Sequence, residues 1–182
     1  MYKVVVCSSS GGGIFESIVE NQQKIGYEVS KLIVDRECGA IKKALKYKIP
    51  INYIDSKLSN KLKSDQFDKL LSSETNLIVL AGYMPIISNI ICKKWKGKLI
   101  NTHPSLLPKY GGKGMYGTHV HQAVKENHET ETGITIHYVN EAYDEGEVIF
   151  QAKVTIENED SIEIIASKVH ELEQANFPKV IQ

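Results

Sequence analysis

Two polar side chains with the chemistry to act on a carbonyl group stand close together in the run Asn101-Thr102-His103-Pro104-Ser105-Leu106-Leu107-Pro108. The run begins at the carboxyl end of a predicted strand, which is where open α/β sheets place their ligands. On an extended chain, residues two apart point the same way, so Asn101 and His103 would face one site. An Asn amide that donates to an oxygen, beside a His that moves protons, suits attack on a carbonyl. The alternative for an isolated His is a surface residue beside turn prolines.

An acidic residue that would assist this pair is Asp144, in the loop sequence Asn140-Glu141-Ala142-Tyr143-Asp144-Glu145-Gly146. The loop separates two predicted strands. A carboxylate next to an imidazole favours the charged ring and fixes its orientation. The sequence by itself does not bring Asp144 to His103, and an exposed loop acid is the competing interpretation.

A candidate binding site is the run Ser8-Ser9-Ser10-Gly11-Gly12-Gly13, which separates a predicted strand from a predicted helix. Glycines let the backbone approach a ligand closely, and the free N–H groups at a helix start favour an anion. The spacing is neither G-x-G-x-x-G nor G-x-x-x-x-G-K-[ST], and no lysine stands where a triphosphate would need one. The run therefore predicts a site for a single phosphate, with a flexible Gly/Ser turn as the alternative.

The elements that would position these residues alternate along the first hundred residues. Strands are predicted at 3–7, 28–34, 49–54, 76–81 and 98–101, with helical apolar spacing between them. Such alternation predicts βαβ units and a parallel sheet. A glycine- and proline-rich stretch over 102–117 then precedes a short helix at 118–127, strands at 133–139 and 148–156, and a helix at 161–181 capped by Asp160 or Ser161. We expect one α/β domain over residues 1–182, with a twisted, mainly parallel sheet flanked by helices.

The amino-acid composition argues against several classes of protein: general nucleic-acid binders, disulfide- or zinc-stabilised domains and membrane-spanning proteins. The chain has 182 residues, with 22 Lys plus Arg against 22 Asp plus Glu, so it lacks the basic field of a general nucleic-acid binder. Its three cysteines are far apart, which favours a reducing compartment over a disulfide framework or zinc knuckle. The longest apolar run is too short to span a bilayer. We expect a cytoplasmic protein that binds neither nucleic acid nor membrane, and we interpret the lysines around Trp95 as a solvated helix end.

The Asn-x-His-Pro-Ser-Leu-Leu-Pro run, followed later in the chain by Asp144, resembles the signature of the folate-dependent formyltransferases. Together with Leu80-Ala81-Gly82-Tyr83-Met84 and the short length, the whole chain resembles the phosphoribosylglycinamide formyltransferases among them. That resemblance implies a formyltransferase-like fold and a transferase of one-carbon metabolism and purine (IMP) biosynthesis. The enzyme would move a formyl group from the co-substrate 10-formyltetrahydrofolate to the amine of glycinamide ribonucleotide, without a metal. Whether it is a monomer or a homodimer stays open.

The resemblance also implies roles for individual positions. The catalytic residues would be Asn101, His103 and Asp144. The substrate phosphate would lie on Gly11, Gly12 and Gly13. Folate would contact Met84, Pro85, Ile86, Ile87, Asn101, Asn140, Glu141, Ala142, Tyr143 and Asp144. The glycinamide end would contact His170, Glu171, Leu172 and Glu173, while Ser64, Thr135 and His137 are secondary candidates.

The chain departs from the family pattern in its anion contacts. Gly12 and Gly13 stand where Ser-Asn is usual, so a phosphate would rely on backbone N–H groups. Pro85 stands where an arginine is common, and a second arginine expected near Ser64 is missing. These two gaps predict altered contacts to the folate carboxylates, with Lys63 as the nearest basic neighbour.

Three alternative functions share these motifs. A formyltetrahydrofolate hydrolase would use water as the nucleophile, and its family carries an N-terminal regulatory domain that we do not expect here. A methionyl-tRNA formyltransferase would need a C-terminal RNA-binding domain and a basic face. A non-catalytic mononucleotide-binding module would explain the glycines but leave Asn101, His103 and Asp144 without a task.

His119 and His121 form an H-x-H pair at a predicted helix start, where no further ligands stand near, so we do not expect a metal site.

Overall fold

Strands and helices alternate along the first half of the chain in the computed structural model, which describes residues 1–142 and 144–181. The elements up to residue 103 are β1 (Tyr2–Cys7), α1 (Gly13–Ile25), β2 (Tyr27–Val34), α2 (Gly39–Lys46), β3 (Ile51–Tyr53), α3 (Asn60–Leu70), β4 (Thr75–Leu80), α4 (Asn89–Lys94) and β5 (Leu99–His103). They are followed by α5 (Thr118–Glu126), β6 (Glu131–Tyr138), β7 (Val148–Thr155) and α6 (Ile162–Val180). This order confirms the predicted βαβ units followed by a short helix, two strands and a terminal helix.

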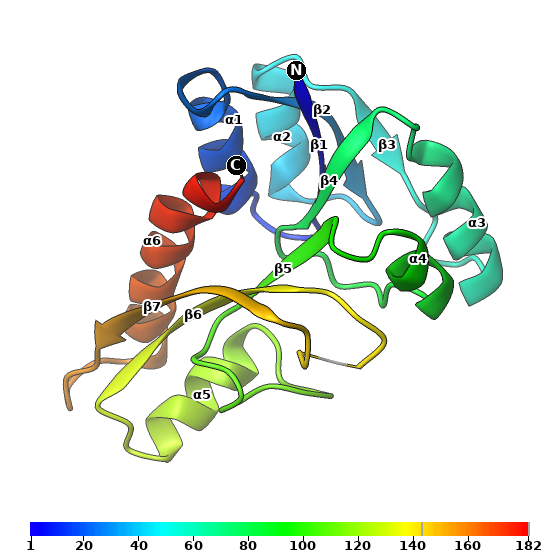
Figure 1. The fold of residues 1–182 in the computed structure, drawn as a ribbon. Coiled ribbons are helices and arrows are strands. Elements are labelled where there is room, and N and C mark those ends of the chain that lie inside the picture. Colours follow the sequence, from blue (N-terminus) through cyan, green and yellow to red (C-terminus); the bar gives the residue numbers. More distant parts are fainter. Residues whose placement is uncertain (143, 182) are drawn as a thin grey trace.

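The described strands form one sheet, in the order β3-β2-β1-β4-β5-β6-β7 (Figure 1). β1 pairs in parallel with β2 and β4, and β3 and β5 extend the parallel part on either side. β6 and β7 run antiparallel to their neighbours. The sheet is therefore mainly parallel, as expected. The strand order reverses between β1 and β4, and in open α/β sheets ligands bind outside the carboxyl ends of the strands at such a point.

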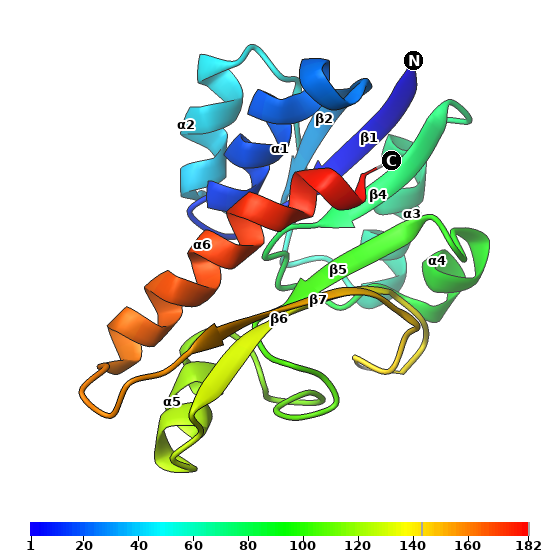
Figure 2. The same cartoon turned by 60° about the vertical axis from the view of Figure 1, so that its left-hand side comes forward.

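Helices cover both faces of the parallel part, which explains why its strands are apolar on both sides. Figure 2 shows α1, α2 and α6 on one face and α3 and α4 on the other. On the first face, Val4 and Val6 of β1 pack in one cluster with Phe15 of α1. On the second face, Val5 joins a cluster that includes Trp95, which follows α4. A rigid sheet packed on two sides thus carries the loops at its carboxyl edge.

The ends of several elements differ from the sequence prediction. The third strand covers residues 51–53 rather than 49–54, because Pro50 has no N–H group and β3 pairs with only three residues of β2. β5 continues two residues further than predicted, to His103, so the whole Asn-x-His motif lies on the strand. The cap of the terminal helix agrees with the prediction: Ser161, one of the two expected residues, accepts a hydrogen bond from a backbone N–H group of the first turn.

The lysines around Trp95 and the three cysteines can be compared with what the sequence analysis expected of them. Lys93 and Lys94 are exposed in the last turn of α4, as expected for a solvated helix end. Cys7, Cys38 and Cys92 are free thiols. Within the two described ranges, no helix is both long enough and apolar enough to cross a lipid bilayer.

Candidate active site

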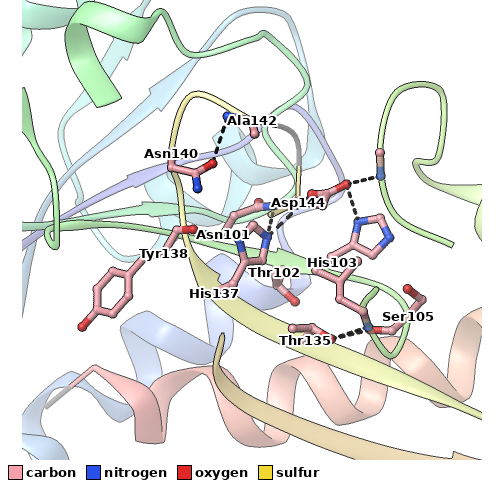
Figure 3. A network of polar contacts seen from close by, with 12 residues as sticks. Asn101, Thr102, His103, Ser105, Thr135, His137, Tyr138, Asn140, Ala142 and Asp144 are labelled. Carbon is pink, nitrogen blue, oxygen red and sulfur yellow. Dashed lines mark hydrogen bonds and ion pairs between the residues drawn. The ribbon is translucent and has the colours of Figure 1, made fainter. Parts of the chain in front are cut away.

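Four polar side chains meet at the end of β5 (Figure 3). Asn101 and His103 share one face of this strand, and the adjacent β6 supplies His137, which lies opposite Asn101 in the sheet register. Nδ1 of His103 lies 3.5 Å from one carboxylate oxygen of Asp144, and Nε2 of His137 lies 3.6 Å from the other. The structure therefore brings together the three residues predicted to be catalytic and adds the secondary candidate His137.

Asp144 reaches this cluster from the β6–β7 loop, with its backbone in the left-handed region at φ 56°. Its side chain is only 16% exposed, and Oδ2 accepts a hydrogen bond of 2.9 Å from the backbone N–H of Gly112. The carboxylate is thereby held between the two imidazole rings. The exposed loop acid that the sequence left open is not what the structure shows.

His103 is 4% exposed, and each of its ring nitrogens faces an oxygen atom. Nε2 lies 2.7 Å from the carbonyl oxygen of Tyr110, which can only accept, so Nε2 carries a proton. Nδ1 faces the carboxylate of Asp144. Nδ1 is therefore the ring nitrogen that is directed into the cluster, toward Asp144.

His137 fixes the orientation of the Asn101 amide. Nδ1 of His137 lies 2.9 Å from the carbonyl oxygen of Tyr138 and donates to it. Burial lowers the pKa of His137, and the Tyr138 hydrogen bond and the Asp144 charge offset this only in part, so the ring is neutral near pH 7. Its Nε2 is then an acceptor for the Asn101 amide nitrogen at 3.3 Å. The second N–H of that amide is left for another acceptor, such as a developing oxyanion.

Thr135, the other secondary candidate on β6, supports the turn after His103. Its buried hydroxyl donates to the carbonyl oxygen of Ser105 at 2.7 Å. The hydroxyl oxygen of Thr135 also accepts hydrogen bonds from the backbone N–H of Leu107 at 3.0 Å and from Nε2 of Gln151 at 2.9 Å. Thr135 therefore holds the catalytic turn in place rather than contacting the cluster.

The glycine run forms the entry to α1, and its three glycines are not equivalent. Gly12 has φ 75°, and a Cβ there would lie 2.6 Å from Cα of Ala40 in α2, so only glycine fits. A Cβ on Gly13 would meet Gln174 of α6 at 2.6 Å, whereas a Cβ on Gly11 would meet nothing within 4 Å. The first N–H groups of α1 have no partner within the helix, so the run presents donors to an anion at this edge. Packing against α2 is thus a second reason for Gly12, beside ligand approach.

The predicted folate residues fall into two segments. Pro85, Ile86 and Ile87 line a pocket of about 140 Å³ together with Ser64 and Lys63 of α3. Exposed Met84 precedes them in the chain. Asn140, Glu141 and Ala142 are exposed in the β6–β7 loop, where Glu141 Oε1 lies 3.9 Å from Nζ of Lys93. Tyr143 lies outside the described residues. Lys63 is therefore the cation at the pocket where an arginine was expected.

The residues predicted for the glycinamide end form a separate cluster on the other face of β5. Thr102 points to that face, and its hydroxyl donates to Oε1 of buried Glu173 at 3.0 Å. His170 Nδ1 lies 3.0 Å from Oε2 of Glu173, and this hydrogen bond raises the pKa of His170. Glu171 is exposed and Leu172 is half-buried on the same helix. The structure joins His170 and Glu173 to each other but not to the Asn-x-His face.

Sequence reasoning missed the contribution of the loop that follows the motif. The carbonyl of Tyr110 binds His103 and the N–H of Gly112 binds Asp144, so this loop closes over the catalytic pair. The glycine-rich composition of 111–117 was the available signal for the Gly112 contact, because a backbone N–H group makes it. Among residues 1–142 and 144–181, no group of three or more His, Cys, Asp or Glu side chains is placed to hold a metal ion.

Comparisons with known proteins agree with this geometry. Residues 2–181 match the family described as Formyl transferase. A phosphoribosylglycinamide formyltransferase of Bacillus subtilis is 35% identical over 188 residues, covering 100% of this chain and 94% of the relative. One of Haemophilus influenzae is 35% identical, covering 100% of this chain and 86% of the relative. A solved phosphoribosylglycinamide formyltransferase of Coxiella burnetii has a TM-score of 0.90 at 31% identity, covering 99% and 85% of the two chains. The chain belongs to the formyl transferase family and, within it, to the phosphoribosylglycinamide formyltransferases.

Proposed function

We propose that the chain transfers a formyl group from 10-formyltetrahydrofolate to the primary amine of glycinamide ribonucleotide, in de novo purine biosynthesis. The observation that carries the proposal is the cluster of Asn101, His103 and Asp144, with His137, at the end of β5. Its groups donate hydrogen bonds and move protons, but it contains no Ser or Cys nucleophile. Such a site suits a reaction in which the substrate amine is itself the nucleophile.

The transfer balances without a metal or redox partner. The neutral amine nitrogen attacks the formyl carbon, and the carbonyl oxygen becomes an oxyanion. The free N–H of Asn101 donates to this oxyanion, and the imidazole ring of His103 beside it is proposed to stabilise the same charge. The bond from the formyl carbon to the folate nitrogen then breaks, and that nitrogen takes the proton that the attacking amine loses. Asp144 orients the His103 ring and is proposed to order a water that carries the proton.

The remaining site residues divide between the two substrates. The ribose phosphate is proposed to lie on the backbone N–H groups of Gly11, Gly12 and Gly13. Folate is proposed to lie between the loop that starts at Met84 and the β6–β7 loop that carries Asp144. His170 and Glu173 are proposed to contact the glycinamide ribonucleotide from the α6 side of β5. The free thiols of Cys7, Cys38 and Cys92 support a cytoplasmic location.

One assay separates this function from its alternatives. Purified protein is mixed with 10-formyltetrahydrofolate, with and without glycinamide ribonucleotide, and the release of tetrahydrofolate is followed. We expect release only when the nucleotide is present, with one formylated amine formed per folate released. Release at the same rate without nucleotide would identify a hydrolase. No release under either condition would leave a non-catalytic mononucleotide-binding module.

A further inference from the structure

A buried carboxylate outside the catalytic cluster lies at the end of β2. Asp35 is 4% exposed, and its Oδ2 accepts hydrogen bonds from Nε and Nη2 of Arg36 at 2.9 and 2.7 Å. Its Oδ1 accepts a hydrogen bond of 2.5 Å from the hydroxyl of Ser9. Both carboxylate oxygens are therefore engaged, and the proton of the Ser9 hydroxyl is committed to Asp35.

Ser9 joins two loops that lie far apart in the sequence. Because its hydroxyl proton points to Asp35, its lone pairs are free to accept, and the backbone N–H of Met84 donates to them at 2.9 Å. The backbone N–H of Ser9 also donates to the carbonyl of Gly82 at 2.9 Å. β1 and β4 are paired neighbours in the sheet (Figure 1), so these contacts cross the point where the strand order reverses.

The two loops joined by Ser9 are those that the proposed function assigns to the two substrates. Ser9 lies two residues before Gly11, at the start of the proposed phosphate site. Met84 is the first residue of the proposed folate segment. Reaction between two bound substrates depends on the distance between the reacting atoms, and a displacement of about 1 Å costs roughly 100-fold in rate.

We propose that Ser9, oriented by Asp35, is a positioning residue that sets the spacing between the phosphate loop and the folate loop. The inference rests on the proposed function. Ser9 is proposed to act on the two loops rather than on a substrate. It acts by holding the Met84 amide at a fixed place relative to Gly11, and Asp35 acts by directing the Ser9 hydroxyl proton away from that amide.

The test compares single-turnover formyl transfer, at saturating concentrations of both substrates, in Ser9→Ala, Ser9→Thr and Ser30→Ala. Ser30→Ala is the matched control, because the Ser30 hydroxyl also binds backbone, the carbonyl of Val4 at 3.1 Å, but on β2 and away from both loops. We expect Ser9→Ala to lower the rate at least tenfold. Ser9→Thr keeps the hydroxyl and should stay within about threefold of the wild type, as should the control.

Two results would overturn the inference: a Ser9→Ala rate within threefold of the wild type, or a Ser9→Thr rate no better than that of Ser9→Ala. If Ser9→Ala does not fold, Asp35→Asn decides. In this variant the amide oxygen of residue 35 accepts from Arg36, and the amide nitrogen donates to the Ser9 hydroxyl. The Ser9 hydroxyl is then oriented differently toward the Met84 N–H, and the rate of formyl transfer should again fall. An unchanged Asp35→Asn rate contradicts the inference. Failure of the proposed function is distinct, because the wild type would then formylate no nucleotide.

Discussion

Replacing Asn101, His103 or both with alanine should give three variants with nearly the same rate of formyl transfer. Both side chains project from one face of β5, and both contact the network formed by His137 and Asp144. Loss of one oxyanion donor typically lowers the rate about 100- to 1,000-fold, or roughly 3–4 kcal/mol. Two independent donors would together cost about 6–8 kcal/mol. Two donors that serve one charge lose most of their effect with the first removal.

The assay is single-turnover formyl transfer at saturating substrate, which separates the chemical step from binding and product release. We expect each single variant to lose about 100- to 1,000-fold, and the double variant to lie within about tenfold of the poorer single. Residual activity should rise with pH, because the substrate amine must be neutral to attack. His128→Asn is the control, since His128 is exposed outside the cluster and Asn tolerates its left-handed backbone.

Two outcomes would refute the reasoning. A His103→Ala variant with a near-normal single-turnover rate and only weaker substrate affinity would make His103 a binding residue. A double variant whose loss equals the sum of the two single losses, in kcal/mol, would show that Asn101 and His103 act on different charges.

Three further predictions concern groups around the cluster. Burial lowers the pKa of His121 from 6.5 to about 4. Between these two pH values His121 is protonated in the unfolded chain but neutral in the folded chain. The free energy of unfolding should drop by about 3 kcal/mol between pH 7 and pH 4 on this account, and His121→Phe should show a shallower pH dependence in urea titrations. Gly11→Asp adds a carboxylate without a clash and should weaken glycinamide ribonucleotide binding at least tenfold in calorimetry; an equal loss of folate affinity would argue against a dedicated phosphate site. Thr102→Val leaves a buried oxygen of Glu173 without its donor and should lower the free energy of unfolding by about 1–3 kcal/mol, whereas an unchanged urea midpoint would show that this hydrogen bond adds no net stability.

The sequence predicts those parts of the site whose geometry depends only on residues close together in the chain. The two-residue spacing of Asn101 and His103 places them on one face of any strand, and β5 confirms it. The meeting of His103 with Asp144 follows no local pattern. It depends on the pairing of β5 with β6 and on a left-handed residue in the next loop, so only the family resemblance pointed to it.

Contacts between distant segments explain what the sequence did not show. Ser9 and Asp35 are 26 positions apart, and Thr102 and Glu173 are 71 apart. Each pair meets only because the strand order places particular loops or a particular helix side by side. Gly12 is a related case, since its need for glycine comes from α2 packing against it. Propensity and motif spacing carry no information about such neighbours.

The left-handed backbone at Asp144 has a consequence for reading conservation at this position. Asp, Asn and Gly tolerate positive φ, whereas a β-branched or bulky residue there is strained. Selection for the loop's shape alone would restrict position 144 to this small group, even in a relative that had lost its catalytic activity. An Asp at position 144 can therefore be retained for two separate reasons: its tolerance of the left-handed backbone and the charge of its carboxylate. An Asp144→Asn variant keeps the first and removes the second, so it assigns the role of the charge more cleanly than alanine does.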